Sequence, residues 1–211
     1  MILFLNGGIS QDRNIWCINK LKNYIKTEEI NTMNITEDID WYELLYKLEQ
    51  VSAVVLACDV HMDSIPAAVV TFLEKIEKEV INGAFIPGKF YAILHTSLYE
   101  GEQTELAMSM LKNFCDRANI LWGCGLGIGG NQIIYAQPKV TCKKKWFGIK
   151  IDENSLISAI EVPVAELAMR IREHSQVDDE YYTPVDISRS VYMRFVNKEA
   201  KRFHRVKMAQ N

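Results

Sequence analysis

Short, continuous apolar runs alternate with amphipathic segments along the first 130 residues, and this alternation restricts the fold more than any other feature. The clearest run is 51–58 (VSAVVLAC), and 1–5 and 90–95 are similar. Runs that are apolar at nearly every position indicate strands buried on both faces, as in parallel sheets covered by helices. Between the runs, apolar residues recur at helical spacing, for example in 64–81. The sequence therefore predicts an α/β protein with a parallel sheet between two helical layers.

Two weaker runs, 29–35 and 120–123, bring the predicted strands to five. Because crossover connections are right-handed, only a few doubly wound topologies remain, and we predict a five-stranded parallel sheet in the order 2-1-3-4-5 with helices on both faces. We expect residues 1–211 to form a single domain, with 175–211 as a C-terminal helical extension.

Composition excludes several classes of protein. A net charge of −3 does not favour a nucleic-acid partner. The five cysteines are scattered and lack C-x-x-C spacing, which argues against a disulfide framework or a metal site and fits a reducing compartment. The apolar start is too short for a signal segment, and no later run is long enough to span a membrane. We expect a cytoplasmic protein with no membrane partner.

Ligands of doubly wound sheets bind beyond the carboxyl ends of the strands. The loops at that edge are 6–14, 58–64, 95–101 and 123–131. The first loop offers backbone N–H groups, hydroxyls and amides at the start of a helix, which is a donor set suited to an anion. An ordinary β-to-α turn capped by Asp12 would use the same residue types, so both interpretations stay open for this loop.

The stretch 123–130 (GCGLGIGG) contains the pattern G-x-G-x-x-G, which is typical of dinucleotide-binding loops. Such a loop follows the first strand and opens a helix, whereas this stretch follows the predicted fifth strand. Close backbone approach or a tight bend therefore explains the glycines better. The four histidines are scattered and no G-x-S-x-G elbow is present, so the sequence assigns no catalytic residue.

Several segments resemble the NAD(P)H-dependent FMN reductase and flavodoxin-like oxidoreductase family. The most specific stretch is 105–130 (ELAMSMLKNFCDRANILWGCGLGIGG), and 1–8 (MILFLNGG), 54–76 and 183–203 are similar in type. The resemblance implies a flavodoxin-like fold that binds FMN at the ends of strands one, three and four. It also implies NAD(P)H as electron donor, a small-molecule electron acceptor or a redox partner protein, and a homodimer.

The resemblance also assigns residues to the cofactor. The positions that match the family's phosphate loop, ring loop and fourth-strand loop are Gly7, Gly8, Ser10, Arg13, Asn14, Asp59, Val60, His61, Met62, Thr96, Ser97 and Tyr99.

Two of these loops depart from the family pattern. Gly8 and Ile15 replace a serine and a threonine, which removes two hydroxyl donors, a loss that Ser10 and Arg13 can offset because an arginine binds phosphate bidentately. Cys58-Asp59-Val60-His61 stands where members carry Thr/Ser-Pro-x-Tyr. We therefore expect weak FMN binding. A non-enzymatic binding module with a weakened or lost FMN site, or a flavodoxin-type electron carrier, stays as an alternative to the reductase.

Overall fold

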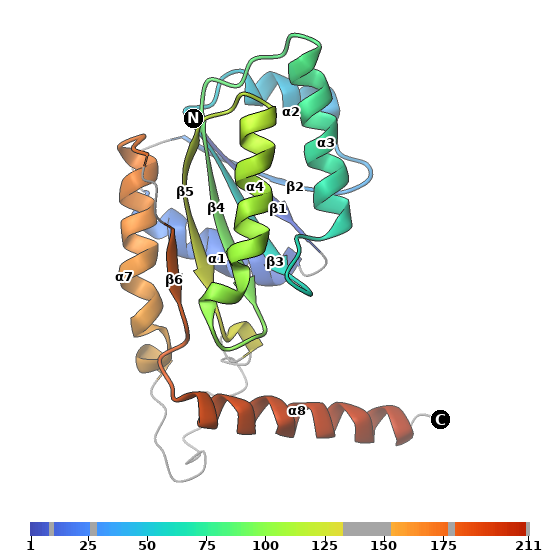
Figure 1. Ribbon diagram of the computed structural model, residues 1–211, viewed down its shortest axis with the longest axis vertical. Helices are drawn as coiled ribbons and strands as arrows, with labels where there is room; N and C mark the ends of the chain where they lie inside the picture. The colour runs from blue at the N-terminus through green and yellow to red at the C-terminus, as the bar shows by residue number, and fades with distance from the viewer. Residues whose placement is uncertain (9–10, 26–28, 133–152, 177–179, 210–211) are drawn as a thin grey trace.

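A parallel sheet of six strands lies between two helical layers (Figure 1). The computed structural model describes residues 1–8, 11–25, 29–132, 153–176 and 180–209. The strand order is β2-β1-β3-β4-β5-β6, and every neighbouring pair is parallel. The strands are β1 (Ile2–Gly7), β2 (Ile30–Asn34), β3 (Ala53–Val60), β4 (Lys89–Thr96), β5 (Trp122–Ile128) and β6 (Tyr181–Thr183).

The helices divide between the two faces of the sheet, and each layer has its own apolar core. Helices α2 (Trp41–Leu48), α3 (Ala67–Ile81) and α4 (Glu105–Arg117) cover one face, and a short 3₁₀ turn, η1 (Gly101–Thr104), leads into α4. Helices α1 (Gln11–Tyr24) and α7 (Glu153–Arg172) cover the other. The last helix, α8 (Arg189–Ala209), begins at the carboxyl edge of the sheet and runs out beyond the domain (Figure 1).

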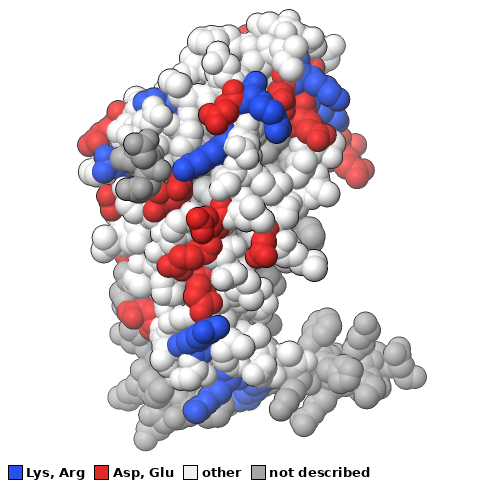
Figure 2. Space-filling model, viewed as in Figure 1, with Lys and Arg blue, Asp and Glu red and all other residues white. Residues whose placement is uncertain are grey.

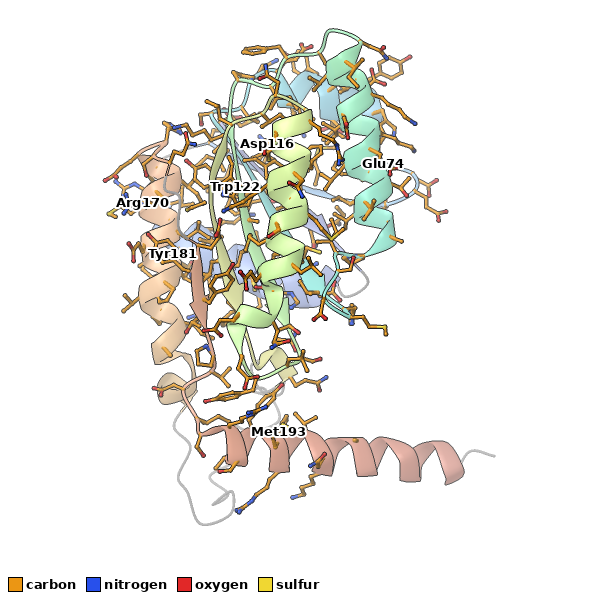
Figure 3. The ribbon with its side chains drawn as sticks, in the orientation of Figure 1. Glu74, Asp116, Trp122, Arg170, Tyr181 and Met193 are labelled. Atoms are coloured by element: carbon orange, nitrogen blue, oxygen red, sulfur yellow. The ribbon has the colours of Figure 1, made fainter. Side chains whose placement is uncertain are left out.

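The prediction of a parallel sheet covered by helices is confirmed, and the order 2-1-3-4-5 holds for the first five strands. The prediction of five strands is wrong, because β6 adds a sixth beside β5. A strand of three residues is too short to show a hydrophobic period. It is held by its ladder to β5 and by Tyr181, whose hydroxyl donates to Glu166 of α7 at 2.7 Å (Figure 3). It lies within 175–211, the segment predicted as a helical extension.

The fifth strand also differs from its prediction. It spans Trp122–Ile128, so its glycines lie in a buried strand and not in a turn after it. A Cβ on Gly125 would lie 2.3 Å from the sulfur of Met108, and one on Gly127 would lie 2.1 Å from the hydroxyl of Thr104. The glycines therefore let η1 and α4 pack directly against the backbone of β5, which confirms close approach and not a dinucleotide loop.

Two strand ends and one helix start lie at different residues from those expected. β3 runs on through Asp59 and Val60, which pair with His95 and Thr96 of β4. The connection after β3 therefore spans 61–66 and not the predicted 58–64. The helix expected over 64–81 begins at Ala67, with Pro66 as its N-cap and no side-chain cap. Within the described ranges, no helix is long and apolar enough to cross a membrane.

A test of the close packing around β5 and η1 compares two glycines. A Cβ on Gly129 would lie 2.0 Å from the carbonyl oxygen of Tyr99, which is backbone and cannot swing away, whereas Gly83 has φ +109° and no neighbour within 4 Å. We predict that Gly129→Ala lowers the free energy of unfolding by about 2–3 kcal/mol or more. Gly83→Ala should cost only about 1 kcal/mol, since its cost is conformational alone.

Urea unfolding followed by circular dichroism measures both variants. Equal losses for the two would contradict the steric explanation of Gly129.

Candidate functional site

The carboxyl ends of β1, β3 and β4 meet at one edge of the sheet. Gly7 of β1 pairs with Cys58, and the next residue of β3, Asp59, pairs with His95 of β4. The ladder therefore brings the first loop, the end of β3 and the end of β4 together, as the sequence predicted for a site at this edge.

A buried carboxylate occupies the inside of the first loop. Asp59 is 2% exposed, and its Oδ2 lies 2.6 Å from Nε2 of His61. Its other oxygen, Oδ1, is buried and has no hydrogen-bond partner among the residues that the structure describes. That oxygen faces Gly8, because a Cβ built on Gly8 would lie 2.0 Å from it. A side chain at residue 8 would therefore clash with Asp59, and the backbone φ of +102° at Gly8 also favours glycine.

A chain of buried polar side chains ties the same edge together beneath the loops. The ring of His95 lies between Asn14 and Asn131, with Nε2 2.6 Å from Oδ1 of Asn14 and Nδ1 2.9 Å from Nδ2 of Asn131. Asn14 in turn donates from Nδ2 to the carbonyl oxygen of Gly7. An amide oxygen only accepts and an amide nitrogen only donates. Nε2 of His95 must therefore donate to Asn14 and Nδ1 must accept from Asn131, which makes the ring a neutral imidazole with its proton on Nε2.

The three side chains of this hydrogen-bonded row are almost fully buried: Asn14 and His95 are 0% exposed and Asn131 is 3% exposed. Of the three, the sequence predicted only Asn14 as a site residue. His95 closes the apolar run 90–95, and a polar residue in that place is a signal that could have found it, whereas Asn131 only follows the glycine-rich stretch 123–130.

The turn after β3 presents exposed side chains at the edge. His61 and Ser64 exchange backbone hydrogen bonds of 3.0 and 3.1 Å, and the two residues between them, Met62 and Asp63, have φ of +50° and +63°. This pattern is a two-residue turn that glycine or asparagine usually occupies. The turn leaves the Met62 side chain 99% exposed and that of His61 54% exposed. Two non-glycine residues in the left-handed region cost on the order of 1 kcal/mol or more each, and such strain gathers at functional sites.

The loop after β4 is hydrogen-bonded to the first turn of α8 and to the segment before it. The Tyr192 hydroxyl donates to the carbonyl oxygen of Ser97 at 2.5 Å, and the Tyr99 hydroxyl donates to that of Ile187 at 2.6 Å. The rings of Tyr99 and Tyr192 lie 5.7 Å apart, and burial raises the pKa of Tyr192 to about 12. The hydroxyl of Thr96 accepts from the N–H of Leu98 at 3.2 Å. This loop therefore anchors the first turns of α8.

The remaining predicted residues are placed as follows. Val60 is 4% exposed and belongs to the core between the sheet and α2, α3 and α4. Arg13 lies in the first turn of α1, and its side chain is outside the described part of the chain. Ser10 lies outside the described residues, as does the basic cluster 143–145.

A separate hollow of about 320 Å³ lies at the carboxyl end of β2, between the chain around Trp41 and the start of α3. The rings of Trp41 and Phe72 lie 5.5 Å apart, and the Lys75 ammonium lies 5.2 Å from the centre of the Trp41 ring. None of the residues predicted for the cofactor lines this hollow.

FMN, the cofactor that the resemblance implies, would place its phosphate in the first loop. A phosphate there would lie beside the buried carboxylate of Asp59. No described residue donates a hydrogen bond to Oδ1 of that carboxylate. Two like unit charges about 4 Å apart repel by about 4 kcal/mol at the effective dielectric of a protein surface. The described residues of this loop do not fit the phosphate group of FMN. The exposed turn at His61 and Met62, in contrast, is open to a flat ring.

The strand order and the loops at the carboxyl edge define a flavodoxin-like fold. The chain is similar to an NADPH-quinone reductase from P. pentosaceus, with TM-score 0.55, 12% identity and coverage of 84% of this chain and 99% of that one. It is also similar to an FMN-dependent NADH-azoreductase from Bacillus anthracis str. Ames Ancestor in complex with FMN (TM-score 0.55, 14% identity, coverage 80% and 97%). A flavodoxin from Streptococcus pneumonia TIGR4 gives TM-score 0.55 at 6% identity, with coverage of 82% and 99%.

At these identities the likeness shows the fold, and it confirms at that level the resemblance to flavodoxin-like reductases. No protein-family model and no curated protein sequence matches the chain.

The polar chain through His95 yields a stability prediction. His95→Leu removes the partner of Asn14 Oδ1 and of Asn131 Nδ2, both of which are buried. Each buried polar group left without a partner costs about 1–3 kcal/mol, so we predict a loss of about 2–4 kcal/mol in the free energy of unfolding. Urea unfolding measures the loss, and ¹⁵N NMR of the parent protein should show a neutral His95 ring protonated at Nε2. A charged ring, or a variant as stable as the parent, would refute the assigned network.

Proposed function

We propose that the chain is a flavin-dependent oxidoreductase that transfers hydride from NAD(P)H to a flavin at the carboxyl edge of its sheet. A small-molecule electron acceptor or a redox partner protein would then take the electrons. The observation that carries the proposal is the strand order. The order in which the chain adds strands to the sheet reverses between β1 and β3, and ligands of such parallel sheets bind beyond the carboxyl ends of the strands at that point. The exposed, strained turn at 61–64 follows β3 at that edge of the sheet.

The protein's own part in this function is binding and orientation, because a flavin supplies the redox chemistry when it is bound. His61 and Met62 are the exposed side chains at the edge that can contact a ring. Cys58 lies one residue before Asp59 but is not a nucleophile. It is 0% exposed, and burial, together with the charge of Asp59, raises the pKa of its thiol well above the usual range.

The flavin is held weakly when it is FMN. The first loop lacks two hydroxyl donors at Gly8 and Ile15, and it contains the carboxylate of Asp59 where a phosphate would sit. A charge-assisted hydrogen bond to phosphate contributes roughly 1.5–3 kcal/mol, so two missing donors lower the affinity on the order of a hundredfold or more.

A second candidate function is a non-enzymatic binding module on the same fold. The observation that favours it is the same buried carboxylate, because a protein that no longer holds FMN would tolerate an acid in the phosphate loop. The fold alone does not separate a reductase from a binding protein.

The two candidates differ in a spectroscopic experiment. Protein saturated with flavin, supplied as FMN or as riboflavin, should lose its visible flavin band when NADH or NADPH is added without oxygen. We predict that His61→Ala lowers the flavin occupancy or the rate of bleaching, whereas His61→Tyr preserves or raises both, because an aromatic ring at this exposed turn packs against the flavin.

The control is Asp116→Ala, which changes an exposed residue of α4 outside this turn. Flavin that binds but is bleached by dithionite and by neither nicotinamide would indicate an electron carrier. Protein that takes up no flavin would leave the binding module as the better account.

We further propose that the protein is a homodimer in which α8 of one copy lies against the acidic face of the other. Residues 189–209 carry seven basic residues and one acidic residue, Glu199, in a chain whose net charge is −3. Figure 2 shows acidic side chains gathered over the middle of the domain and basic ones at the start of α8. Glu180, Glu105 and Glu102 surround Tyr182, and their charges add to the burial that raises its pKa to about 12.

Light scattering should therefore give the mass of two chains at low salt. The triple variant Lys201→Glu, Arg202→Glu and Arg205→Glu should be monomeric, because like charges then meet at the interface. The control Lys78→Glu, on the exposed side of α3, should leave the dimer intact. A parent protein that is monomeric at high concentration, or a triple variant that stays dimeric, would refute this arrangement.

A further inference from the structure

We propose that Asp59 takes the place of a ligand phosphate, so that the site selects a neutral flavin, riboflavin, over FMN. This inference rests on the proposed function, since it names the form of the flavin that the same edge binds. It follows from the disagreement between the first loop and the phosphate of FMN.

The first step is the position of the carboxylate. The loop between β1 and α1 leads into the N-terminus of a helix of 14 residues, where aligned peptide dipoles attract negative charge. Asp59 reaches this loop from β3, the neighbouring strand, and its Oδ1 faces Gly8. The negative charge that such a loop attracts is therefore supplied by the protein itself.

The second step is the unmet hydrogen bond. Asp59 is 98% buried, and its Oδ1 has no partner among the described residues, whereas its Oδ2 is paired with His61. A buried acceptor without a donor is costly, so a ligand that brings a donor to it is favoured. A carboxylate only accepts hydrogen bonds, and an ionised phosphate also presents acceptors and like charge. Riboflavin ends its ribityl chain in a hydroxyl, which can donate, at the position where FMN carries the phosphate.

The third step explains Gly8. A serine at this position would place its Cβ 2.0 Å from Oδ1 of Asp59, and the backbone has φ +102°. The hydroxyl that phosphate-binding loops of this type use cannot coexist with the buried acid. The two departures, Gly8 and Asp59, therefore belong together. A loop that would donate hydrogen bonds to a phosphate has become a loop that accepts a hydrogen bond from a hydroxyl.

The experiment titrates the full-length protein with riboflavin and with FMN, each followed by the quenching of flavin fluorescence. We expect riboflavin to bind at least about tenfold more tightly than FMN. Asp59→Asn keeps the size of the side chain and removes its charge. This variant should raise the affinity for FMN by roughly tenfold or more and change that for riboflavin by less than about threefold.

Asp116→Asn is the matched control, because it removes a charge from an exposed aspartate of α4, outside this edge. It should leave the ratio of the two affinities unchanged. If Asp59→Asn does not fold, Asp59→Ser serves as the second variant, with the same expected rise in FMN affinity.

The ratio of the affinities separates this proposal from a purely structural role for Asp59. If Asp59 had only a structural role, Asp59→Asn would lower the affinity for both flavins by a similar factor, and that result would overturn the proposal. FMN binding as tight as riboflavin binding in the parent protein would overturn it too, while the proposed function would stand. If neither flavin binds, the proposed function falls and this inference falls with it.

Discussion

The register of the β1–β3–β4 ladder is the constraint on which the rest of the structure depends. It places Gly7 beside Cys58 and Asp59 beside His95, so the ends of three strands share one edge. Had β3 paired one residue differently, its side chains would exchange faces, because successive residues of a strand point to opposite sides. Asp59 would then leave the first loop. The buried contact between its carboxylate and Gly8 is a consequence of strand pairing and not of the local sequence.

Two sets of contacts hold this edge in place. Beneath it, the chain from Asn14 through His95 to Asn131 joins α1, β4 and the segment after β5 with buried hydrogen bonds. Beside it, Tyr99 and Tyr192 fix the start of α8 to the loop after β4. The turn at Met62 is the exposed part between them. A rigid frame around one exposed, strained turn is the arrangement expected of a ligand site that is largely preformed.

The chemistry of the edge differs from that of a loop built for phosphate. An acid that is almost fully buried, with one oxygen free of described partners, repels an anion and attracts a donor. The likeness to quinone reductases, azoreductases and flavodoxins shows the fold, and the fold accommodates several chemistries. The flavin proposals above follow from the side chain that β3 places beside Gly8 of the first loop.

The sequence by itself determined the α/β class, the parallel sheet and the order of its first five strands, because continuous apolar runs such as 51–58 are long and unambiguous. It also pointed to Gly8 and Asp59 as departures. Only the tertiary structure decided that these two meet, that His95 joins Asn14 and Asn131, and that a sixth strand forms at Tyr181. Periodicity reports which face of an element is buried. Contacts between residues 36 or more positions apart, such as these, depend on strand register and close packing, and no local pattern encodes those.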